Sequence, residues 1–410
     1  MAPAARLAWQ RLAPSDWPVP LEAFPPGAAL VGGAVRDALL NRLGPTPDLD
    51  LVLPGDAVAL CRQLRRQYGG SAVVLDAERS IARLVLQGWT LDLARQEGDS
   101  LLADLQRRDY TINAMALPLA EPHQLVDPLG GAGHLASGEL VAVAEANLLD
   151  DPLRLLRGVR LASELGFRLE ARTEAWIHSH AASLAGVAGE RVLAELEKLA
   201  AAPNGAAGLA VVWQAELLRP WLAGSADLGN PMHQLEPLSP ERAAALGLTA
   251  AEAAEALPLA RLAALLDGPA LQMLRSSRQL QQRVERLRHW QQQPSAWTLA
   301  EPERLQLQRQ LERDLPALLL SWPQQDAAAQ WLTRWRDPHD PLFHPRPAID
   351  GGRLQRELGL TPSPLLGQLL DHLMLERAFG RIHSPDEALQ AAQTWLVGIG
   401  QNAGSAPRRD

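Results

Sequence analysis

The sequence predicts an α+β fold, in which a head of mixed strands and helices (residues 28–140) is followed by an all-α remainder. Two observations lead to this prediction. From Ala28 to about Leu140, short runs rich in aliphatic and β-branched residues alternate with amphipathic helical segments. Beyond Ala144 the strand pattern stops, and Ala, Leu, Glu, Gln and Arg recur at helical spacing between Pro- and Gly-rich connections.

The strands expected in the head are short and closely spaced. They are AALVGG (28–33), DLDLVLP (48–54), SAVVLD (71–76), ARLVLQ (82–87) and WTLDLA (89–94). A helix is expected between the second and third strands, with Gly69 as its stop. Residues 1–27 form a Pro-rich lead-in, and residues 401–410 are expected to be disordered.

Length and composition restrict the class of protein. The chain has 410 residues and should hold several domains, since roughly 100–200 residues form a typical one. With 47% hydrophobic and 21% charged residues, a packed core is expected. No apolar run approaches the roughly 18 residues that span a bilayer, and the N-terminus does not resemble a secretory signal, so a cytoplasmic protein is expected. The single cysteine, Cys61, is expected to be a buried structural thiol.

The net charge leaves the partner open. A formal charge of −8 argues at first against a nucleic-acid partner, but an active site that carries carboxylates and metal ions weakens this inference. Lys198 is the only lysine, so the basic side chains are otherwise arginines. Arginine suits bidentate contacts with phosphates and base edges, although a GC-rich genome would produce the same bias.

Gly32 and Gly33 separate the first strand from the first helix in LVGGAVRDALLNRLG (30–44). The helix should run to about Leu43, with Gly44 as its stop. A glycine turn at a helix N-terminus offers free N–H groups and a positive dipole to an anion such as phosphate. Taken alone, such a turn is more often structural than a phosphate site.

Asp48 and Asp50 strengthen the case for a site. Residues two apart on a strand point to the same face, so these carboxylates repel each other unless a cation lies between them. Oxygen ligands favour Mg²⁺, and two such ions can activate a hydroxyl and hold a triphosphate. A solvated strand end is the structural alternative. With Arg36 and Asp37 nearby, a metal–nucleotide site is favoured.

Four later segments follow the Gly-Gly turn and the Asp pair along the chain. They are RRDYTINAMAL (107–117), LVDPLGG (125–131), LLDDPLRLLRGVRLASELGF (148–167) and GERVLAELEKL (189–199). Together with the Gly-Gly turn and the Asp pair, they resemble the class II tRNA nucleotidyltransferases. These are the CCA-adding enzymes and bacterial poly(A) polymerases of the polymerase-beta superfamily.

The resemblance implies a domain order and an activity. It implies a polymerase-beta-type head at 28–140, base-reading neck helices at 141–200, a helical body at 201–290 and a helical tail at 291–400 that holds the tRNA elbow. The implied reaction is attack of the tRNA 3′-hydroxyl on the α-phosphate of CTP, with pyrophosphate as the leaving group. Two Mg²⁺ ions would be held by Asp48 and Asp50.

The segment 148–167 should form a helix with Asp151 as N-cap and Pro152 at its first position. It should end before Gly166. One face should carry Leu155, Leu156 and Val159, and the other face should carry Arg154 and Arg157.

The basic face has two interpretations. A capped helix with a solvated basic face is the structural one. The resemblance implies instead that Asp151 and Arg154 read the incoming base, since this pair matches the amine and ring nitrogen of C and A and mismatches U and G. Arg157 would reach the triphosphate, and Asp150 stands where the family usually has Glu, a departure expected to matter little.

The resemblance also assigns roles in the head. Asp109 and Asn113 would lie near the ribose 2′-hydroxyl, and Arg108 near the phosphates. Asp92, in the strand WTLDLA, is the candidate third carboxylate that would activate the primer hydroxyl. A polar position on a half-exposed strand explains Asp92 equally well.

One departure from the family bears on specificity. Members that add both C and A carry a longer mobile loop between the strand of the Asp92 position and the RRD motif, and loop-deleted members add CC. Here the connection is short, which favours CC addition over complete CCA addition. A loop shortened for unrelated reasons, a poly(A) polymerase and an inactive RNA-binding scaffold are the alternatives.

The C-terminal half resembles the family only faintly. Its tryptophans are expected mainly in the core rather than stacked on RNA: Trp213, Trp221, Trp290, Trp297, Trp322, Trp331, Trp335 and Trp395. His339 and Asp340 have no companion His set, so an appended phosphohydrolase metal site is not expected.

Overall fold

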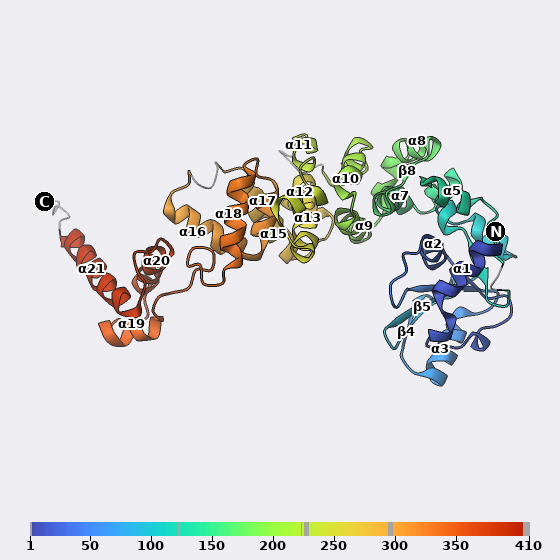
Figure 1. The fold of residues 1–410 in the computed structure, drawn as a ribbon, viewed down its shortest axis with the longest axis horizontal. Coiled ribbons are helices and arrows are strands. Elements are labelled where there is room, and N and C mark those ends of the chain that lie inside the picture. The colour runs from blue at the N-terminus through green and yellow to red at the C-terminus, as the bar shows by residue number, and fades with distance from the viewer. Residues whose placement is uncertain (1, 122–123, 223, 225–228, 294–297, 405–410) are drawn as a thin grey trace. The chain divides into compact units, whose positions relative to one another are not determined.

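The computed structural model describes residues 2–121, 124–222, 224, 229–293 and 298–404 (Figure 1). The chain divides into two compact units, Met1–Trp221 and Leu222–Asp410. None of the described helices is both long and apolar enough to cross a membrane. The first unit holds the sheet and the second is helical, so the α+β prediction is confirmed.

A six-stranded sheet forms the centre of the N-terminal unit, with strand order β3-β4-β5-β2-β1-β6. The strands are β1 (Ala29–Val31), β2 (Leu49–Leu53), β3 (Ser71–Asp76), β4 (Ile81–Leu86), β5 (Trp89–Arg95) and β6 (Ala116–Pro118). Only β2 and β5 pair in parallel; the other neighbours are antiparallel. The five predicted strands are all present. Strand β6 was not predicted, because three residues inside the segment RRDYTINAMAL and just after it are too few to show strand periodicity.

Helix α3 (Ala57–Tyr68) lies beside β3, β4 and β5 and covers one face of the sheet (Figure 1). The Asp56 carboxylate caps it by accepting hydrogen bonds from the N–H groups of Val58 and Ala59. Gly69 ends it with a φ of 88°, as predicted. Cys61 is 1% exposed on its inner side, and burial raises the pKa of this thiol. The prediction of a structural thiol is consistent with this position.

The lead-in is not a simple extension of the head. Residues 2–12 form helix α1 (Ala2–Leu12), which packs against α2 (Gly33–Leu40). Arg11 Nη1 donates hydrogen bonds to the carbonyl oxygens of Ala38 and Leu39, at 2.8 and 3.2 Å. The Pro-rich composition of residues 1–27 hid this helix. The end of α2 was also predicted too late, because Asn41 adopts the left-handed conformation and stops it before Leu43.

Short helices and one small sheet connect the head to the rest of the N-terminal unit. The head continues through α4 (Leu101–Gln106), α5 (Gly131–Ser137) and α6 (Glu145–Asp150) to α7 (Leu153–Leu165). Strands β7 (Glu139–Leu140) and β8 (Arg168–Leu169) pair in parallel beside it. Helices α8 (Ala171–Ser179), α9 (Gly189–Ala201) and α10 (Gly205–Gln214) follow, and α7 packs against α9 and α10.

Helix α7 begins one residue later than predicted. Pro152 occupies the cap position with a helical backbone, and no side chain caps the helix. Asp151 is therefore not an N-cap; its carboxylate pairs with Arg191 instead. Gly166 ends the helix at a φ of 70°, and Leu155, Leu156 and Val159 are buried, as predicted.

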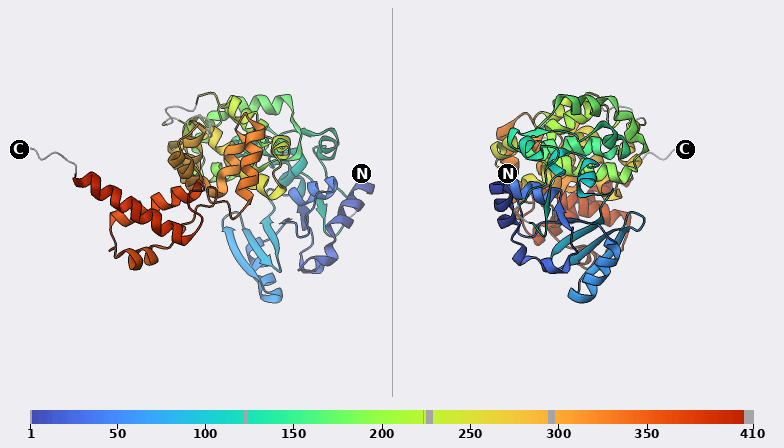
Figure 2. Two further views of the ribbon diagram at one scale, coloured as in Figure 1. Left: turned by 60° about the vertical axis from the view of Figure 1, so that its left-hand side comes forward. Right: turned by 90° about the vertical axis from the view of Figure 1, so that its right-hand side faces the viewer.

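The C-terminal unit consists of helices. They are α11 (Met232–Leu235), α12 (Pro240–Leu246), α13 (Ala250–Leu265), α14 (Gly268–Met273), α15 (Arg278–Gln291), α16 (Glu301–Leu311), α17 (Leu315–Leu320), α18 (Gln325–Arg336), α19 (Gly351–Leu358), α20 (Pro364–Ala378) and α21 (Pro385–Gly404). Helix α13 packs on α15 and α17, and α20 and α21 run side by side (Figures 1 and 2). Four of the ten residues expected to be disordered thus belong to α21, and residues 405–410 lie outside the described residues.

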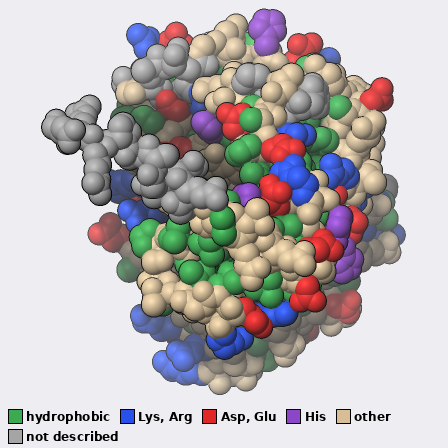
Figure 3. All heavy atoms as spheres, turned by 90° about the vertical axis from the view of Figure 1, so that its left-hand side faces the viewer, with side chains coloured by type: hydrophobic (Ala, Val, Ile, Leu, Met, Phe, Trp, Pro, Cys, Tyr) green, Lys and Arg blue, Asp and Glu red, His purple; other side chains and the backbone are tan. Residues whose placement is uncertain are grey.

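Charged side chains of both signs interleave with apolar ones on the face shown in Figure 3. Ion pairs of the C-terminal unit include Arg381 with Glu301 at 2.8 Å and Arg353 with Asp386 at 3.2 Å. Of the eight tryptophans named above, Trp221 and Trp290 are buried, as expected for core positions, and the other described ones are only half-buried. Trp297 lies outside the described residues.

The contact between Gly158 and Tyr110 joins the head to α7, and it generates a prediction. The Tyr110 hydroxyl donates to the Arg154 carbonyl at 2.7 Å, and a Cβ at Gly158 would lie 1.9 Å from the Tyr110 oxygen. Gly158→Ala should therefore lower the free energy of unfolding by about 1–3 kcal/mol, as overpacking does. Urea denaturation would measure the change.

Gly133→Ala is the matched control, because Gly133 lies in helix α5 and a Cβ there meets nothing within 4 Å. It should be neutral or stabilising by up to about 1 kcal/mol. Equal effects of the two substitutions would contradict the contact.

Candidate active site

Two carboxylates face each other across the only parallel strand pair of the described sheet. Asp50 on β2 is the register partner of Asp92 on β5, and Asp48 immediately precedes β2. Direct partners point to the same face, and so do residues two apart on a strand. The three carboxylates Asp48, Asp50 and Asp92 therefore share one face of the sheet. The parallel pairing, which local sequence does not reveal, brings Asp92 to the predicted pair.

The carboxylates repel one another. Burial raises the pKa of Asp50 to about 6, the negative charges of Asp92 and Asp48 add to the shift, and the Arg108 guanidinium opposes it. A divalent cation among these groups would remove the repulsion, and carboxylate oxygens are the ligands that Mg²⁺ prefers. The donor set therefore fits a magnesium ion.

The described residues do not enclose a metal on their own. Within them, no group of three or more His, Cys, Asp and Glu side chains could hold a metal ion. Mg²⁺ commonly takes one or two carboxylates and completes its shell with water and substrate phosphates. Asp48 and Asp50 would supply these one or two carboxylates.

Gly32 and Gly33 form a tight turn beside the carboxylates. Gly32 has a φ of 73°, which favours glycine, and a Cβ there would lie 3.2 Å from Asp50 Oδ2 and 3.4 Å from Arg108 Nη1. No side chain caps the helix α2 that starts at Gly33. Its first N–H groups thus remain available to an anion next to Asp50.

Arg108 reaches the same turn from the other side. It donates from Nε and Nη2 to Asp104 Oδ2, at 3.2 and 3.0 Å, on the buried side of α4. This bond holds the guanidinium near both Gly32 and Asp50. The predicted phosphate-binding groups, Gly32, Gly33 and Arg108, therefore lie together.

A chain of hydrogen bonds connects three motifs that are far apart in the sequence. Arg36 Nη1 donates to Asn113 Oδ1 at 2.8 Å, and Asn113 Nδ2 donates to Asp109 Oδ1 at 3.3 Å. Arg157 Nη1 on α7 lies 3.4 Å from the other oxygen of Asp109. Arg36 also forms an ion pair with Asp37 at 2.9 Å. The structure thus brings four of the predicted nucleotide-binding residues into one network.

Asp109 is the centre of this network and is 8% exposed. Burial acts to raise its pKa, but the Arg157 charge and hydrogen bonds from the Tyr110 N–H and Asn113 outweigh burial and hold the pKa below its ordinary value. The carboxylate is therefore ionised and firmly oriented. Arg157 pairs in addition with Glu195 on α9 at 3.7 Å, which sequence reasoning did not single out.

The predicted base-reading pair is not joined by a direct bond. Asp151 Oδ2 lies 3.1 Å from Arg191 Nη2, on α9. Arg154 Nη1 donates to the carbonyl oxygens of Asn147 and Arg107, at 2.8 and 3.0 Å. Arg191 lies within the quoted segment GERVLAELEKL, but nothing local to that segment points to Asp151, 40 residues earlier.

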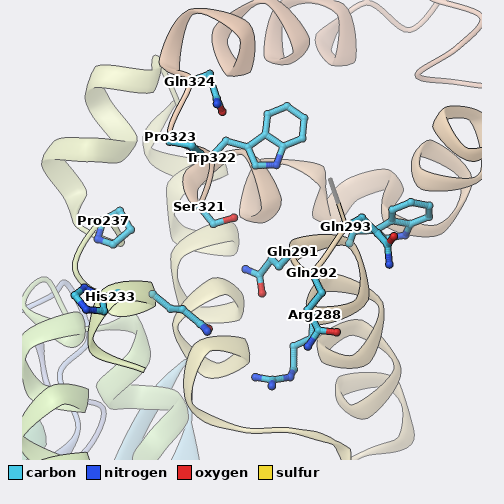
Figure 4. A pocket seen from close by; sticks show the side chains of 12 residues that line it. His233, Pro237, Arg288, Gln291, Gln292, Gln293, Ser321, Trp322, Pro323 and Gln324 are labelled. Carbon is cyan, nitrogen blue, oxygen red and sulfur yellow. The ribbon is translucent and has the colours of Figure 1, made fainter. Parts of the chain in front are cut away.

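The C-terminal unit has a hollow of about 300 Å³ (Figure 4). It is lined by His233, Gln234, Pro237, Arg288, Trp290, Gln291, Gln292, Gln293, Ser321, Trp322, Pro323 and Gln324. Gln291 and Ser321 point toward its middle in Figure 4. Its lining includes one histidine, His233, and no carboxylate, whereas the candidate catalytic residues Asp48, Asp50 and Asp92 all belong to the N-terminal unit.

Comparison with known proteins agrees with this placement. Residues 28–141 match the poly A polymerase head domain, and residues 166–227 match the probable RNA and SrmB-binding site of polymerase A. A CC-adding tRNA nucleotidyltransferase of Synechocystis is 35% identical over 92% of this chain and 95% of its own. An A-adding tRNA nucleotidyltransferase of Deinococcus radiodurans is 31% identical over 92% of this chain and 97% of its own.

Solved structures share the fold. A CCA-adding enzyme in complex with CTP has a TM-score of 0.74 and 21% identity, covering 96% of this chain and 98% of its own. The Thermotoga maritima CCA-adding enzyme complexed with tRNA has a TM-score of 0.68 and 21% identity, covering 90% and 91%. With a close relative aligned along nearly its whole length, this chain belongs to the class II tRNA nucleotidyltransferases and is an enzyme of that family.

Proposed function

We propose that this enzyme adds two cytidines to the 3′ end of tRNA, using CTP and releasing pyrophosphate. The observation that carries the proposal is the shared face of Asp48, Asp50 and Asp92 beside the Gly32 turn. Carboxylates for metal ions and free N–H groups for a triphosphate are the two requirements of nucleotidyl transfer. The relatives of known structure include complexes with tRNA, CTP and ATP, which supports the same partners here.

Different residues of the site would bind different parts of the nucleotide. The turn at Gly32 and Gly33, with Arg36 and Arg108, would bind the triphosphate, and Arg157 would reach it from the neck. Asp109 and Asn113 would accept and donate hydrogen bonds at the ribose 2′-hydroxyl, which dNTP lacks. Catalysis would consist mainly of positioning and of neutralising charge.

The metal ions would be held by Asp48 and Asp50. Bound there, Mg²⁺ would neutralise the phosphate charge and favour ionisation of the primer hydroxyl. Asp92, on the neighbouring strand, would accept the proton of that hydroxyl or help to hold the metal. The raised pKa of Asp50 is consistent with this proposal, because burial and the neighbouring carboxylates both disfavour a lone negative charge there, and a bound cation would relieve both effects.

The base would be read by Asp151 and Arg154. Each must turn away from its present partners, Arg191 for Asp151 and two backbone carbonyls for Arg154. The carboxylate would then accept the amine of cytosine while the guanidinium donates to the ring nitrogen. Uracil would leave two mismatched polar groups, which is costly in a desolvated site.

Two observations support CC addition. Strand β5 ends at Arg95 and α4 begins at Leu101, so the connection between them is only residues 96–100. A connection this short cannot contain the longer mobile loop of family members that add both C and A. The relative from Synechocystis is a CC-adding enzyme, although the 31% identity with an A-adding enzyme makes ATP addition a real alternative.

A first prediction concerns the product. A tRNA transcript ending at the discriminator base, incubated with Mg²⁺ and CTP, should gain two nucleotides, and ATP should add no third. Gel electrophoresis at single-nucleotide resolution would show this. A third nucleotide with ATP would mean complete CCA addition, and a long A tract would mean a poly(A) polymerase.

Two further substrates complete that test. If a transcript already ending in CC gains one A while the shorter one gains nothing, the enzyme is A-adding. Binding of tRNA without any incorporation would make the chain an RNA-binding scaffold.

A second prediction concerns the metal-binding carboxylates. Asp50→Asn should lower the rate of CMP incorporation by about 10³-fold or more, because the metal contribution to transition-state stabilisation is several kcal/mol. Single-turnover incorporation would measure it. Asp16→Asn, the same change at an exposed site in the same unit, should have no effect; equal rates for the two variants would contradict the assignment.

A third prediction concerns base selection. Asp151→Ala should lower the ratio of kcat/KM for CTP over UTP by about 10- to 100-fold, because the mismatch penalty disappears with the carboxylate. The adjacent, exposed Asp150→Ala should keep the ratio. A ratio unchanged in Asp151→Ala would show that other groups read the base.

A further inference from the structure

Arg83 extends the row of charged residues across three strands. Asp92 on β5 is the register partner of Asp50 on one side and of Arg83, on β4, on the other. The three side chains therefore project from the same face of the sheet. Arg83 belongs to none of the motifs recognised in the sequence.

The guanidinium of Arg83 engages both oxygens of Asp92. Nε donates to Oδ1 and Nη2 donates to Oδ2, each at 2.7 Å. This is the parallel two-bond arrangement in which arginine binds a carboxylate most specifically. In the described part of the chain, Asp92 is the one carboxylate that contacts Arg83. The Arg83 guanidinium thus fixes the orientation of the Asp92 carboxylate through both of its oxygens.

This ion pair conflicts with the role proposed for Asp92. A carboxylate whose two oxygens are bound to a guanidinium is a poorer metal ligand and a poorer base than a free one. A divalent ion close to Asp50 and Asp92 would also repel the positive charge of Arg83. The ion pair and a metal-bound Asp92 therefore compete.

The surroundings allow Arg83 to leave. The side chains of Arg83 and Asp92 are 45% and 23% exposed, and ion pairs at such sites contribute little net free energy. The other cross-strand partner of Arg83 is Val73, which is 50% exposed and offers no side-chain acceptor. Within the described residues, the only side-chain hydrogen bonds of the Arg83 guanidinium are those to Asp92, so a rotamer change can separate the two side chains.

We propose that Arg83 is a positioning residue that occupies Asp92 in the metal-free enzyme and releases it when a divalent cation binds at Asp48 and Asp50. The proposal rests on the proposed function, since it needs a metal at the Asp pair. Arg83 thereby keeps a third bare carboxylate from adding to the repulsion in the empty site. Because the ion pair competes with metal binding, Arg83 lowers the affinity of the site for the metal.

Metal binding without turnover tests the proposal directly. Mn²⁺ alone would be titrated into the full-length protein, and the free ion would be followed by its electron paramagnetic resonance signal. Arg83→Gln should bind Mn²⁺ about tenfold more tightly than the wild type, the effect of removing one positive charge a few ångströms from a divalent ion. An affinity that is unchanged or weaker would overturn the proposal.

Arg66→Gln is the matched control. Arg66 is exposed on α3, which covers the opposite face of the sheet. Arg66→Gln has the same net charge as Arg83→Gln, but it should bind Mn²⁺ as tightly as the wild type does. Equal tightening in both variants would show a general charge effect and overturn the proposal. If Arg83→Gln does not fold, Arg83→Lys replaces it: lysine cannot hold both oxygens in one plane, so binding should tighten by a smaller factor, and no tightening would overturn the proposal.

Asp50→Asn separates this inference from the function on which it rests. If the wild type binds Mn²⁺ no better than Asp50→Asn, the metal site itself is wrong. If the wild type binds better and Arg83→Gln does not bind more tightly still, only the role of Arg83 is wrong. A crystal structure with Mn²⁺ should in addition show Arg83 and Asp92 more than 4 Å apart; an intact two-bond pair would overturn the proposal.

Discussion

Repulsion between neighbouring carboxylates is the constraint on which the rest of this structure depends. The parallel pairing of β2 with β5 places Asp50 beside Asp92, and Asp48, two residues before Asp50, lies on the same face. Such an arrangement is unfavourable without positive charge, and the fold supplies it from three directions. Arg108 is tied to Asp104, Arg83 is paired with Asp92, and the N-terminus of α2 begins at the glycine turn. These positive groups offset the carboxylates only in part, since burial and the neighbouring carboxylates still raise the pKa of Asp50, and a bound cation would complete the compensation.

A second theme is the connection between the head and the neck helices. The ribose-binding candidates Asp109 and Asn113 belong to the head, whereas Arg157 belongs to α7, and one hydrogen-bond network joins them. Tyr110 and Gly158 fit closely in the same region, and the Tyr110 hydroxyl bonds to the backbone of α7. The part of the site that would hold the sugar and the part that would read the base are consequently packed against each other within one compact unit.

Local sequence predicted those features that depend on neighbours in the chain. The strands around Asp50 and Asp92 have clear aliphatic patterns, and Gly69 and Gly166 end their helices as expected. Several misses involve partners that are distant in sequence or a composition that hides a helix. The early end of α2 at Asn41 and the short strand β6 are local features that carry no periodic pattern. Asp151 was predicted to cap α7, but Pro152 occupies the cap position and the Asp151 carboxylate pairs with Arg191, 40 residues away. Arg83 was invisible because only the register of β4 on β5 brings it to Asp92. Helix α1 was hidden by the prolines that surround it, and its packing on α2 is a tertiary effect.

The contact of Arg11 with the end of α2 has a consequence for how the N-terminus should be regarded. Helix α2 is short, and its first N–H groups face the candidate phosphate site while Arg11 binds two carbonyl oxygens of its last turn. A cation at the C-terminal end of a helix and an anion at its N-terminal end both oppose the same dipole, so they support one helix from its two ends. Helix α1 therefore supports the helix whose N-terminus is proposed to bind the triphosphate. On that proposal, a tag or truncation that displaces α1 would weaken triphosphate binding without altering any residue that would contact the nucleotide.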